Sequence, residues 1–342
     1  MPLPTFVNHD SGRRAGTVGP VDTVDLGRTG LRTSRLVLGT MTFGGQADAD
    51  ASRAMLEMAA EAGVTHLDTA NSYEQGRSEE ILGELLAGRR DEFVLASKVF
   101  NPHGPGPEDR GLSRTAIVRA VEASLRRLRT DHLDLYYLHQ PDWTVPLEES
   151  LAAMHDLVDA GKVTAVGVSN HAAWQLVEAE RLAGVSGWAP VTVSQVMLNL
   201  LARSLEDEYT AAAAQKGWFS VVYNPLAGGL LTGKHRRDAE PAAGTRFSGA
   251  AYRDRYWHEE QFSAVEALAG IADGAGVSLL ELSMRWAVHH PAVGAVLLGA
   301  SSPDQLRANL DAAAGPALTQ DVLDACDEVY AALRGPVPKY NR

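Results

Sequence analysis

Cysteine is almost absent from this 342-residue sequence, in which Cys326 stands alone. A single cysteine forms neither an internal disulfide nor a cysteine-based metal site, and this usage fits a protein of the reducing cytoplasm. No apolar run approaches the roughly 20 residues that a membrane-spanning helix needs. Residues 1–20 contain Arg13-Arg14 without the apolar stretch that completes an export signal, and we interpret them as a flexible tail.

Positive charge is also scarce. The 31 Lys and Arg residues against 43 Asp and Glu leave a net charge of −12, which argues against nucleic acid or a membrane as a partner because anionic polymers and lipids attract positive surfaces. Any anionic ligand must therefore meet locally placed cations. With 45% hydrophobic and 22% charged residues, the composition excludes a disordered or fibrous chain. The length allows two ordinary domains or one large α/β barrel.

Short β-like runs alternate with longer helical patterns from about Val21 onward. The runs are mostly continuous apolar stretches, which is typical of parallel strands covered on both faces. No Pro-, Gly- and Ser-rich linker divides residues 21–342, so the pattern predicts one domain, a (β/α)8 barrel. The eight runs are RLVLGT (35–40), VTHLD (64–68), FVLASK (93–98), LDLYYLH (133–139), VTAVGVSN (163–170), VTVSQ (191–195), FSVVY (219–223) and AVLLG (295–299).

Three segments fall outside the eight strand–helix units. The stretch 21–36, with Gly27 and Gly30 between β-formers, predicts a short hairpin that plugs the bottom of the barrel. A polar loop runs from about 227 to 260, and loops of that length without regular structure are usually functional. After the last barrel helix we expect an extra helix from Leu318 to Leu333.

Most of the β-like runs finish on a polar residue, and the C-terminal ends of barrel strands converge on the face where barrel enzymes place their chemistry. One or two such residues would mean only that strands end where polarity begins, but seven runs end in this way. The set offers neither paired carboxylates nor a His-x-His pair, which disfavours glycoside hydrolysis and two-metal hydrolysis, and we expect no metal. The finishing residues are Thr40, Asp68, Lys98, His139, Ser169-Asn170, Gln195 and Tyr223.

Three of these residues, together with Tyr73, suggest proton transfer to a carbonyl group. Tyr73 lies in the loop after the second run, and the ammonium of Lys98, held by Asp68, would lower the pKa of its phenol. Tyr73 would then protonate a carbonyl oxygen, to which His139 donates a second hydrogen bond. The alternative is that each residue is structural or merely solvated. A carbonyl that gains a proton must also gain a hydride, which no side chain supplies, so a cofactor is implied.

No G-x-G-x-x-G follows a strand, so a Rossmann site is disfavoured. Another segment that could hold such a cofactor follows the last run. In LLGASSPDQLRANL (297–310) the pair Ser302-Pro303 marks a helix N-terminus, and helix N-termini bind anions. An N-capped helix with solvated polar residues is the alternative. The side chains within reach of a phosphate or adenine are Ser301, Gln305, Arg307 and Asn309.

A second such segment is the loop that begins YNPLAGGLLTGKH after the seventh run. Gly228 and Gly229 would let the backbone approach a ligand closely. Lys234 and Arg246 are cations in a chain of net charge −12, so they mark where a pyrophosphate would be neutralised.

The sequence resembles the aldo-keto reductases from about Val21 to the C-terminus. The resemblance is carried, in this order, by GTMTFGG, LDTANSYEQGRSEEILG, LASKV, LYYLHQPD, GVSN, NPLAGGLLTGK and LLGASSPDQLRANL. It implies a TIM barrel, NADPH, a small-molecule carbonyl substrate and a catalytic tetrad of Asp68, Tyr73, Lys98 and His139. For the cofactor it implies nicotinamide contacts by Ser169, Asn170 and Gln195, a stacking ring at Tyr223, and contacts by Thr40, Met41, Asn224, Pro225, Leu226, Ala227, Gly229, Leu230, Lys234, Arg246, Gly299, Ser301, Gln305 and Asn309.

Within this family the sequence is similar to the aflatoxin aldehyde and succinic semialdehyde reductases. The similar segments are SNHAAWQLVE, GTRFSG, YRDRYW and the C-terminal PKYNR. The likeness implies that Tyr252, Arg255 and Arg342 bind a substrate carboxylate, which a guanidinium grips with two hydrogen bonds. The alternative is that Arg255 pairs with Asp254 or Glu259 at the surface.

Two other functions stay open at this point. Some barrels of this family resemble channel-associated regulatory subunits that keep the cofactor, and a keto-sugar reductase of secondary metabolism would use the same tetrad. A homo-oligomer is compatible with all of these. The charge balance adds one expectation, that five cations form a positive mouth on a negative surface: Lys234, Arg246, Arg255, Arg307 and Arg342.

Overall fold

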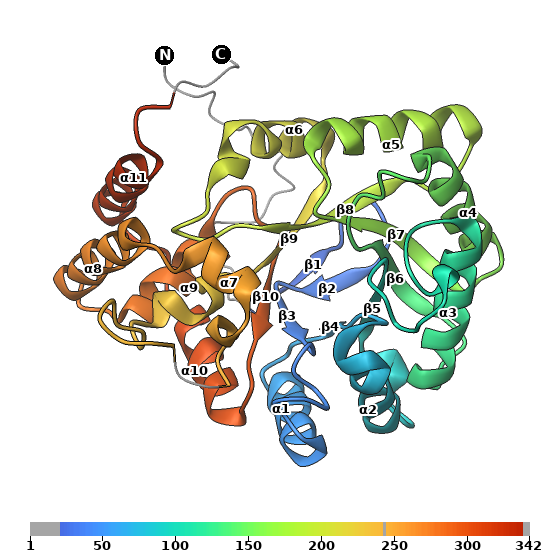
Figure 1. The fold of residues 1–342 in the computed structure, drawn as a ribbon, viewed down its shortest axis with the longest axis horizontal. Coiled ribbons are helices and arrows are strands. Elements are labelled where there is room, and N and C mark those ends of the chain that lie inside the picture. The colour runs from blue at the N-terminus through green and yellow to red at the C-terminus, as the bar shows by residue number, and fades with distance from the viewer. Residues whose placement is uncertain (1–20, 242–243, 338–342) are drawn as a thin grey trace.

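Eight parallel strands close into a barrel in the computed structural model, which describes residues 21–241 and 244–337 (Figure 1). Each predicted run overlaps one of these strands, so the predicted (β/α)8 barrel is confirmed. Neighbouring strands pair in chain order and β10 pairs with β3 to close the ring. The strands are β3 (Leu36–Gly39), β4 (His66–Asp68), β5 (Val94–Val99), β6 (Leu133–Leu138), β7 (Val163–Ser169), β8 (Val191–Met197), β9 (Phe219–Tyr223) and β10 (Ala295–Gly299).

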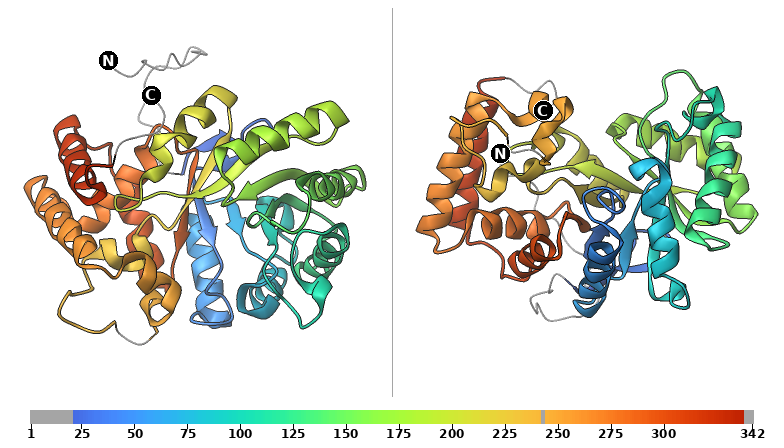
Figure 2. Two further views of the ribbon diagram at one scale, coloured as in Figure 1. Left: turned by 45° about the horizontal axis from the view of Figure 1, so that its top comes forward. Right: turned by 60° about the horizontal axis from the view of Figure 1, so that its bottom comes forward.

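Helices surround the strands, with α2 to α5 on one side and α8 to α11 on the other (Figures 1 and 2). Their apolar stripes face the barrel: in α3, Ile117 and Val121 are fully buried. The helices are α1 (Ala49–Glu61), α2 (Arg77–Leu85), α3 (Arg114–Leu128), α4 (Leu147–Asp159), α5 (Ala173–Ser186), α6 (Tyr209–Lys216), α7 (Ala250–Tyr256), α8 (Glu259–Gly274), α9 (Leu279–His289), α10 (Pro303–Ala313) and α11 (Gln320–Arg334).

The predicted hairpin is present as the antiparallel strands β1 (Thr23–Asp25) and β2 (Arg32–Ser34). Leu26 in its turn is fully buried and packs among inward-facing side chains near the strand starts, Val37 and Val94 among them. The hairpin therefore closes the N-terminal end of the barrel, opposite the strand ends that carry the polar residues.

The segment from 227 to 260 is more ordered than predicted. It contains two 3-10 turns, η5 (Ala227–Thr232) and η6 (Arg246–Ser248), and helix α7. The reason is apolar anchoring, because Phe247 and Tyr256 are buried in the core. The predicted extra helix is confirmed as α11, which packs beside α8 (Figure 1).

Taken singly, no helix of the described ranges combines the length and the apolar composition needed to cross a bilayer. Only α8 and α9 together pass that test, and a bend of 90° separates them.

Candidate active site

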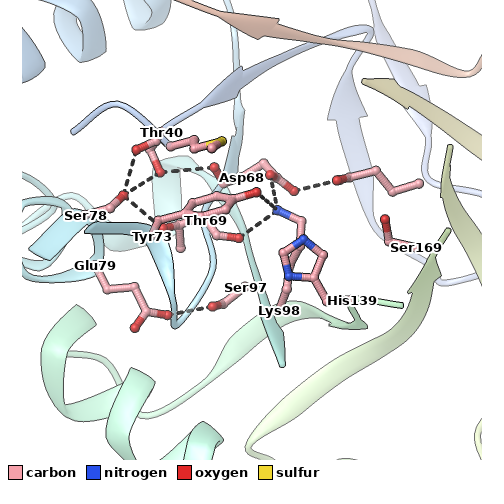
Figure 3. A network of polar contacts seen from close by, with 12 residues as sticks. Thr40, Asp68, Thr69, Tyr73, Ser78, Glu79, Ser97, Lys98, His139 and Ser169 are labelled. Carbon is pink, nitrogen blue, oxygen red and sulfur yellow. Dashed lines mark hydrogen bonds and ion pairs between the residues drawn. The ribbon is translucent and has the colours of Figure 1, made fainter. Parts of the chain in front are cut away.

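The four residues of the predicted tetrad meet at the C-terminal face of the barrel (Figure 3). Asp68 ends β4 and Lys98 lies near the end of β5, so adjacent parallel strands bring their side chains together. Tyr73 begins the short 3-10 turn η1 (Tyr73–Gly76) after β4, and His139 directly follows β6. Residues up to 71 positions apart in sequence are thus neighbours because their strands end on one face.

Lys98 is the centre of the polar network. Its ammonium is fully buried, forms an ion pair with Asp68, and donates hydrogen bonds to the Thr69 carbonyl at 2.8 Å and to the Tyr73 hydroxyl at 3.2 Å. Gln195 donates to the other Asp68 oxygen at 2.8 Å. A buried charge is costly unless it is paired and hydrogen-bonded, and here both members of the pair are. The ammonium is therefore fixed in place beneath the Tyr73 phenol.

The surroundings of Tyr73 shift the pKa of its phenol in two opposite directions. Burial raises the pKa of the Tyr73 phenol, and although Lys98 lowers it, the net shift is upward. The expectation of a lowered pKa was wrong, because the sequence revealed the cation but not the desolvation. Burial alone would lower the pKa of Lys98, but Asp68 and Tyr73 outweigh it and raise that pKa. Tyr73 is therefore a neutral phenol beside a fixed ammonium, a proton donor whose anion would be compensated.

His139 is held as a neutral imidazole. Burial, with the nearby Lys98, lowers its pKa to about 3. Its ring meets the Tyr73 ring edge-on with centroids 6.1 Å apart. The side-chain nitrogen of Asn101 lies 3.3 Å from His139 Nδ1, so an Nδ1 acceptor leaves the proton on Nε2. Asn101 was not among the residues predicted from the sequence, although its place just after β5 was the available signal.

The loop that carries Tyr73 is strained and clamped from behind. Glu74 and Gln75 adopt left-handed backbone with φ of 47° and 56°, which costs energy for residues other than glycine. Below the loop, fully buried Glu79 accepts a hydrogen bond from Ser97 at 2.6 Å (Figure 3) and pairs with Arg127 at 2.7 Å. This clamp was also missed, because its members come from three separate segments.

A cavity of about 890 Å³ opens beside the tetrad. Most of the predicted cofactor residues line it: Met41, Ser169, Asn170, Gln195, Tyr223, Asn224, Pro225, Leu226, Gly229, Lys234, Arg246, Gly299, Ser301, Gln305 and Asn309.

Three predicted cofactor residues do not line this cavity. Thr40 is fully buried, with its hydroxyl bonded to the Asp68 carbonyl at 3.1 Å and to Ser78 at 2.9 Å, so it joins strand ends instead (Figure 3). Ala227 and Leu230 are fully buried in the core. The sequence placed them in a glycine-rich loop but could not tell which loop residues turn inward.

Three of the five predicted mouth cations line the cavity: Lys234, Arg246 and Arg255. Among the described residues none of the three has a carboxylate partner, whereas most arginines of this structure do. Within the described ranges no ion pair joins Arg255 to Asp254 or Glu259, the predicted alternative, and Glu259 pairs with Arg237 instead.

Tyr252 also lines the cavity, with Arg246 and Arg255 each 5.6 Å from its ring centre. Arg307 lies on α10 but outside the lining, and Arg342 lies outside the described residues.

The helix start after β10 has the predicted cap. Ser302 accepts a hydrogen bond from the Gln305 backbone, and the Gln305 side chain accepts one from the Ser301 hydroxyl at 3.1 Å. Both Ser301 and Gln305 face the cavity. A cavity of this size, lined by a proton donor and by cations that have no carboxylate partner among the described residues, fits an elongated phosphorylated cofactor.

The sequence also matches a family model and several known proteins. A family model described as the aldo/keto reductase family matches residues 35–331. A protein named "Probable voltage-gated potassium channel subunit beta" from Arabidopsis thaliana is 36% identical over 314 residues, which cover 89% of this chain and 95% of that protein. "Aflatoxin B1 aldehyde reductase member 2" from Homo sapiens is 36% identical over 90% of this chain and 89% of its own. "Aldo-keto reductase family 7 member A3" from Homo sapiens is 35% identical over 90% of this chain and 96% of its own.

Proposed function

The chain belongs to the aldo/keto reductase family, and from this membership we propose that it uses NADPH to reduce aldehydes or ketones to alcohols. The family makes the chain an oxidoreductase; the cofactor, the substrate and the residue roles are the proposal. The observation that carries it is the buried Lys98 ammonium, 3.2 Å from the hydroxyl of Tyr73, a residue that lines the cavity.

Tyr73 is the proposed proton donor. As a carbonyl oxygen gains negative charge, the phenol transfers its proton, and the fixed Lys98 ammonium compensates the phenolate that remains. The Asp68 carboxylate and Gln195 hold that ammonium. His139, neutral with a proton on Nε2, donates a second hydrogen bond to the same oxygen and orients it.

NADPH is the proposed cofactor, and it supplies the hydride. Ser169, Asn170 and Gln195 would contact its nicotinamide, beside the ring of Tyr223. Lys234 and Arg246 would neutralise its pyrophosphate, since both line the cavity without a carboxylate partner among the described residues. Ser301, Gln305 and Asn309 would hold its adenosine end.

A carboxylated aldehyde such as succinic semialdehyde is the proposed substrate. Arg255 supports this choice, because it faces the cavity beside the Tyr252 ring and has no carboxylate partner among the described residues. We place the protein in the cytoplasm, on the basis of a single cysteine, Cys326, whose burial raises its thiol pKa to about 11. A homo-oligomer remains part of the proposal.

The relatives named as potassium channel subunits favour a second candidate, a cofactor-binding regulatory subunit. Turnover separates the two. Steady-state loss of NADPH absorbance is measured with succinic semialdehyde and a panel of other aldehydes and ketones, for the wild type and for Tyr73→Phe. Reduction that Tyr73→Phe lowers by about 10²–10⁴-fold, with NADPH binding kept, supports the enzyme. Tight NADPH binding with negligible turnover on every carbonyl supports the regulatory subunit.

A further inference from the structure

A second cavity, of about 680 Å³, adjoins the cavity beside the tetrad, which we call the reactive cavity. It is formed by the segment between β6 and α4 and by the N-terminal end of α5, which lie next to each other in Figure 1. Asn170 lines both cavities. A molecule bound at Tyr73 that extended past Asn170 would enter the second cavity.

Two tryptophans stand at this second cavity. Trp143 is 78% exposed and Trp174 is 58% exposed. Their ring centres are 6.5 Å apart and their planes meet at 36°. Tryptophan is usually well buried, and paired exposed aromatic rings in a hollow are typical of binding sites.

The backbone beneath both rings is fixed by side-chain hydrogen bonds. The Asp142 carboxylate accepts bonds from the backbone nitrogens of Leu112 and Thr144, each at 2.9 Å. The Gln175 side chain accepts one from the Ala172 nitrogen at 2.9 Å, across the first turn of α5. The two rings are thus presented in advance, which lowers the ordering cost of binding.

The charges that line the second cavity indicate which kind of ligand it binds. Among its lining residues there is no Lys or Arg, and Asp142 is the charged member. The reactive cavity, by contrast, has Lys234, Arg246 and Arg255. The second cavity is therefore suited to an uncharged ring, and the reactive cavity to anionic groups.

We propose that Trp143 and Trp174 form a subsite for the aromatic ring of an aryl-substituted carbonyl substrate. The ring stacks on the tryptophans while the carbonyl group lies at Tyr73. This inference rests on the proposed function for the reaction but not for the binding of the ring. It makes aryl-substituted aldehydes a better substrate class than saturated ones of the same size.

The test compares 3-phenylpropanal with 3-cyclohexylpropanal, which differ in aromaticity and not in chain length. We expect the wild type to prefer the phenyl compound in kcat/KM. Trp143→Ala and Trp174→Ala should each reduce this preference several-fold, about tenfold together, through KM rather than kcat. Trp143→Phe and Trp174→Phe should restore most of it. Val185→Ala, an exposed site on the same helix, is the control.

Calorimetric titration with the alcohol 3-phenylpropanol separates this inference from the reaction. Binding that the tryptophan substitutions weaken, in a protein that reduces no aldehyde, would uphold the subsite and overturn the proposed function. Equal kcat/KM for both aldehydes and no effect of the substitutions would overturn the subsite alone. If the substitutions instead convert an oligomer to monomers by light scattering, without changing the aryl preference, the pair is a subunit interface and the subsite is overturned.

Discussion

The Lys98 ammonium lies 3.2 Å from the Tyr73 hydroxyl and is ion-paired with Asp68. The Asp68 carboxylate already compensates the charge of this ammonium before any substrate binds. A phenolate that forms at Tyr73 is therefore stabilised by a group that needs no reorganisation, which is the condition under which electrostatic stabilisation is most effective.

Lys98→Met should stop carbonyl reduction and also destabilise the fold. The substitution leaves the buried Asp68 carboxylate without its cation, a change that costs about 3–5 kcal/mol. Urea unfolding measures the stability, and NADPH absorbance measures the rate. Asp68→Asn combined with Lys98→Met removes both charges and should recover much of the stability but none of the rate. A double variant as unstable as the single one would contradict the idea that the orphaned charge is the cause.

Gly76→Ala should harm activity through the Tyr73 loop. Gly76 has φ of 93°, and a methyl group there would meet Arg127 side-chain atoms at 2.9 Å, against the clamp that Arg127 forms with Glu79. Gly88→Ala is a matched control, because Gly88 has φ of 80° but nothing within 4 Å. Both should lose about 1 kcal/mol of stability to backbone strain. Only Gly76→Ala should also lower kcat, with KM for NADPH little changed; equal kcat in the two variants would show that the clamp does not position Tyr73.

The strand ends could be predicted from the sequence. Because the C-terminal ends of parallel barrel strands lie on one face, this prediction was enough to bring Asp68, Lys98 and His139 together. The burial of individual side chains could not be predicted from the sequence. Burial reversed the expected pKa shift of Tyr73, and it places Thr40 away from the cavity. Contacts between distant segments were equally hidden: the Glu79–Arg127 pair joins residues 48 positions apart, and no local pattern marks it.

Stability should fall as the pH drops below about 6.5, in part because of His66. This side chain is fully buried inside the barrel, and neither ring nitrogen has a hydrogen-bond partner among the described residues. Burial lowers its pKa to about 4 against the attraction of Asp68 and Asp134, with Lys98 adding to the lowering. Between pH 6.5 and 4 the unfolded chain therefore binds a proton that the folded chain does not, and the loss reaches roughly 3 kcal/mol.

His66→Leu should flatten this dependence in urea unfolding measured from pH 7 to pH 4. His258→Leu, at an exposed histidine, should leave the slope as in the wild type. The role of His66 would be refuted by equal slopes in the wild type and in His66→Leu.

Arg255→Met should weaken the binding of carboxylated aldehydes selectively. A charge-assisted hydrogen bond from a guanidinium contributes about 1.5–3 kcal/mol, so KM for succinic semialdehyde should rise about 10–100-fold. Butanal has the same four-carbon chain without the carboxylate, and the ratio of kcat/KM for the two aldehydes isolates the effect of the carboxylate charge.

Arg307→Met is the matched control, since Arg307 is exposed and does not line the cavity. A ratio that falls equally in both variants would mean that the net charge of the protein, and not the guanidinium beside Tyr252, attracts the carboxylate. A ratio that falls in neither would assign Arg255, which has no carboxylate partner among the described residues, to the cofactor instead, and NADPH affinity measured on the same two variants would then reveal that role.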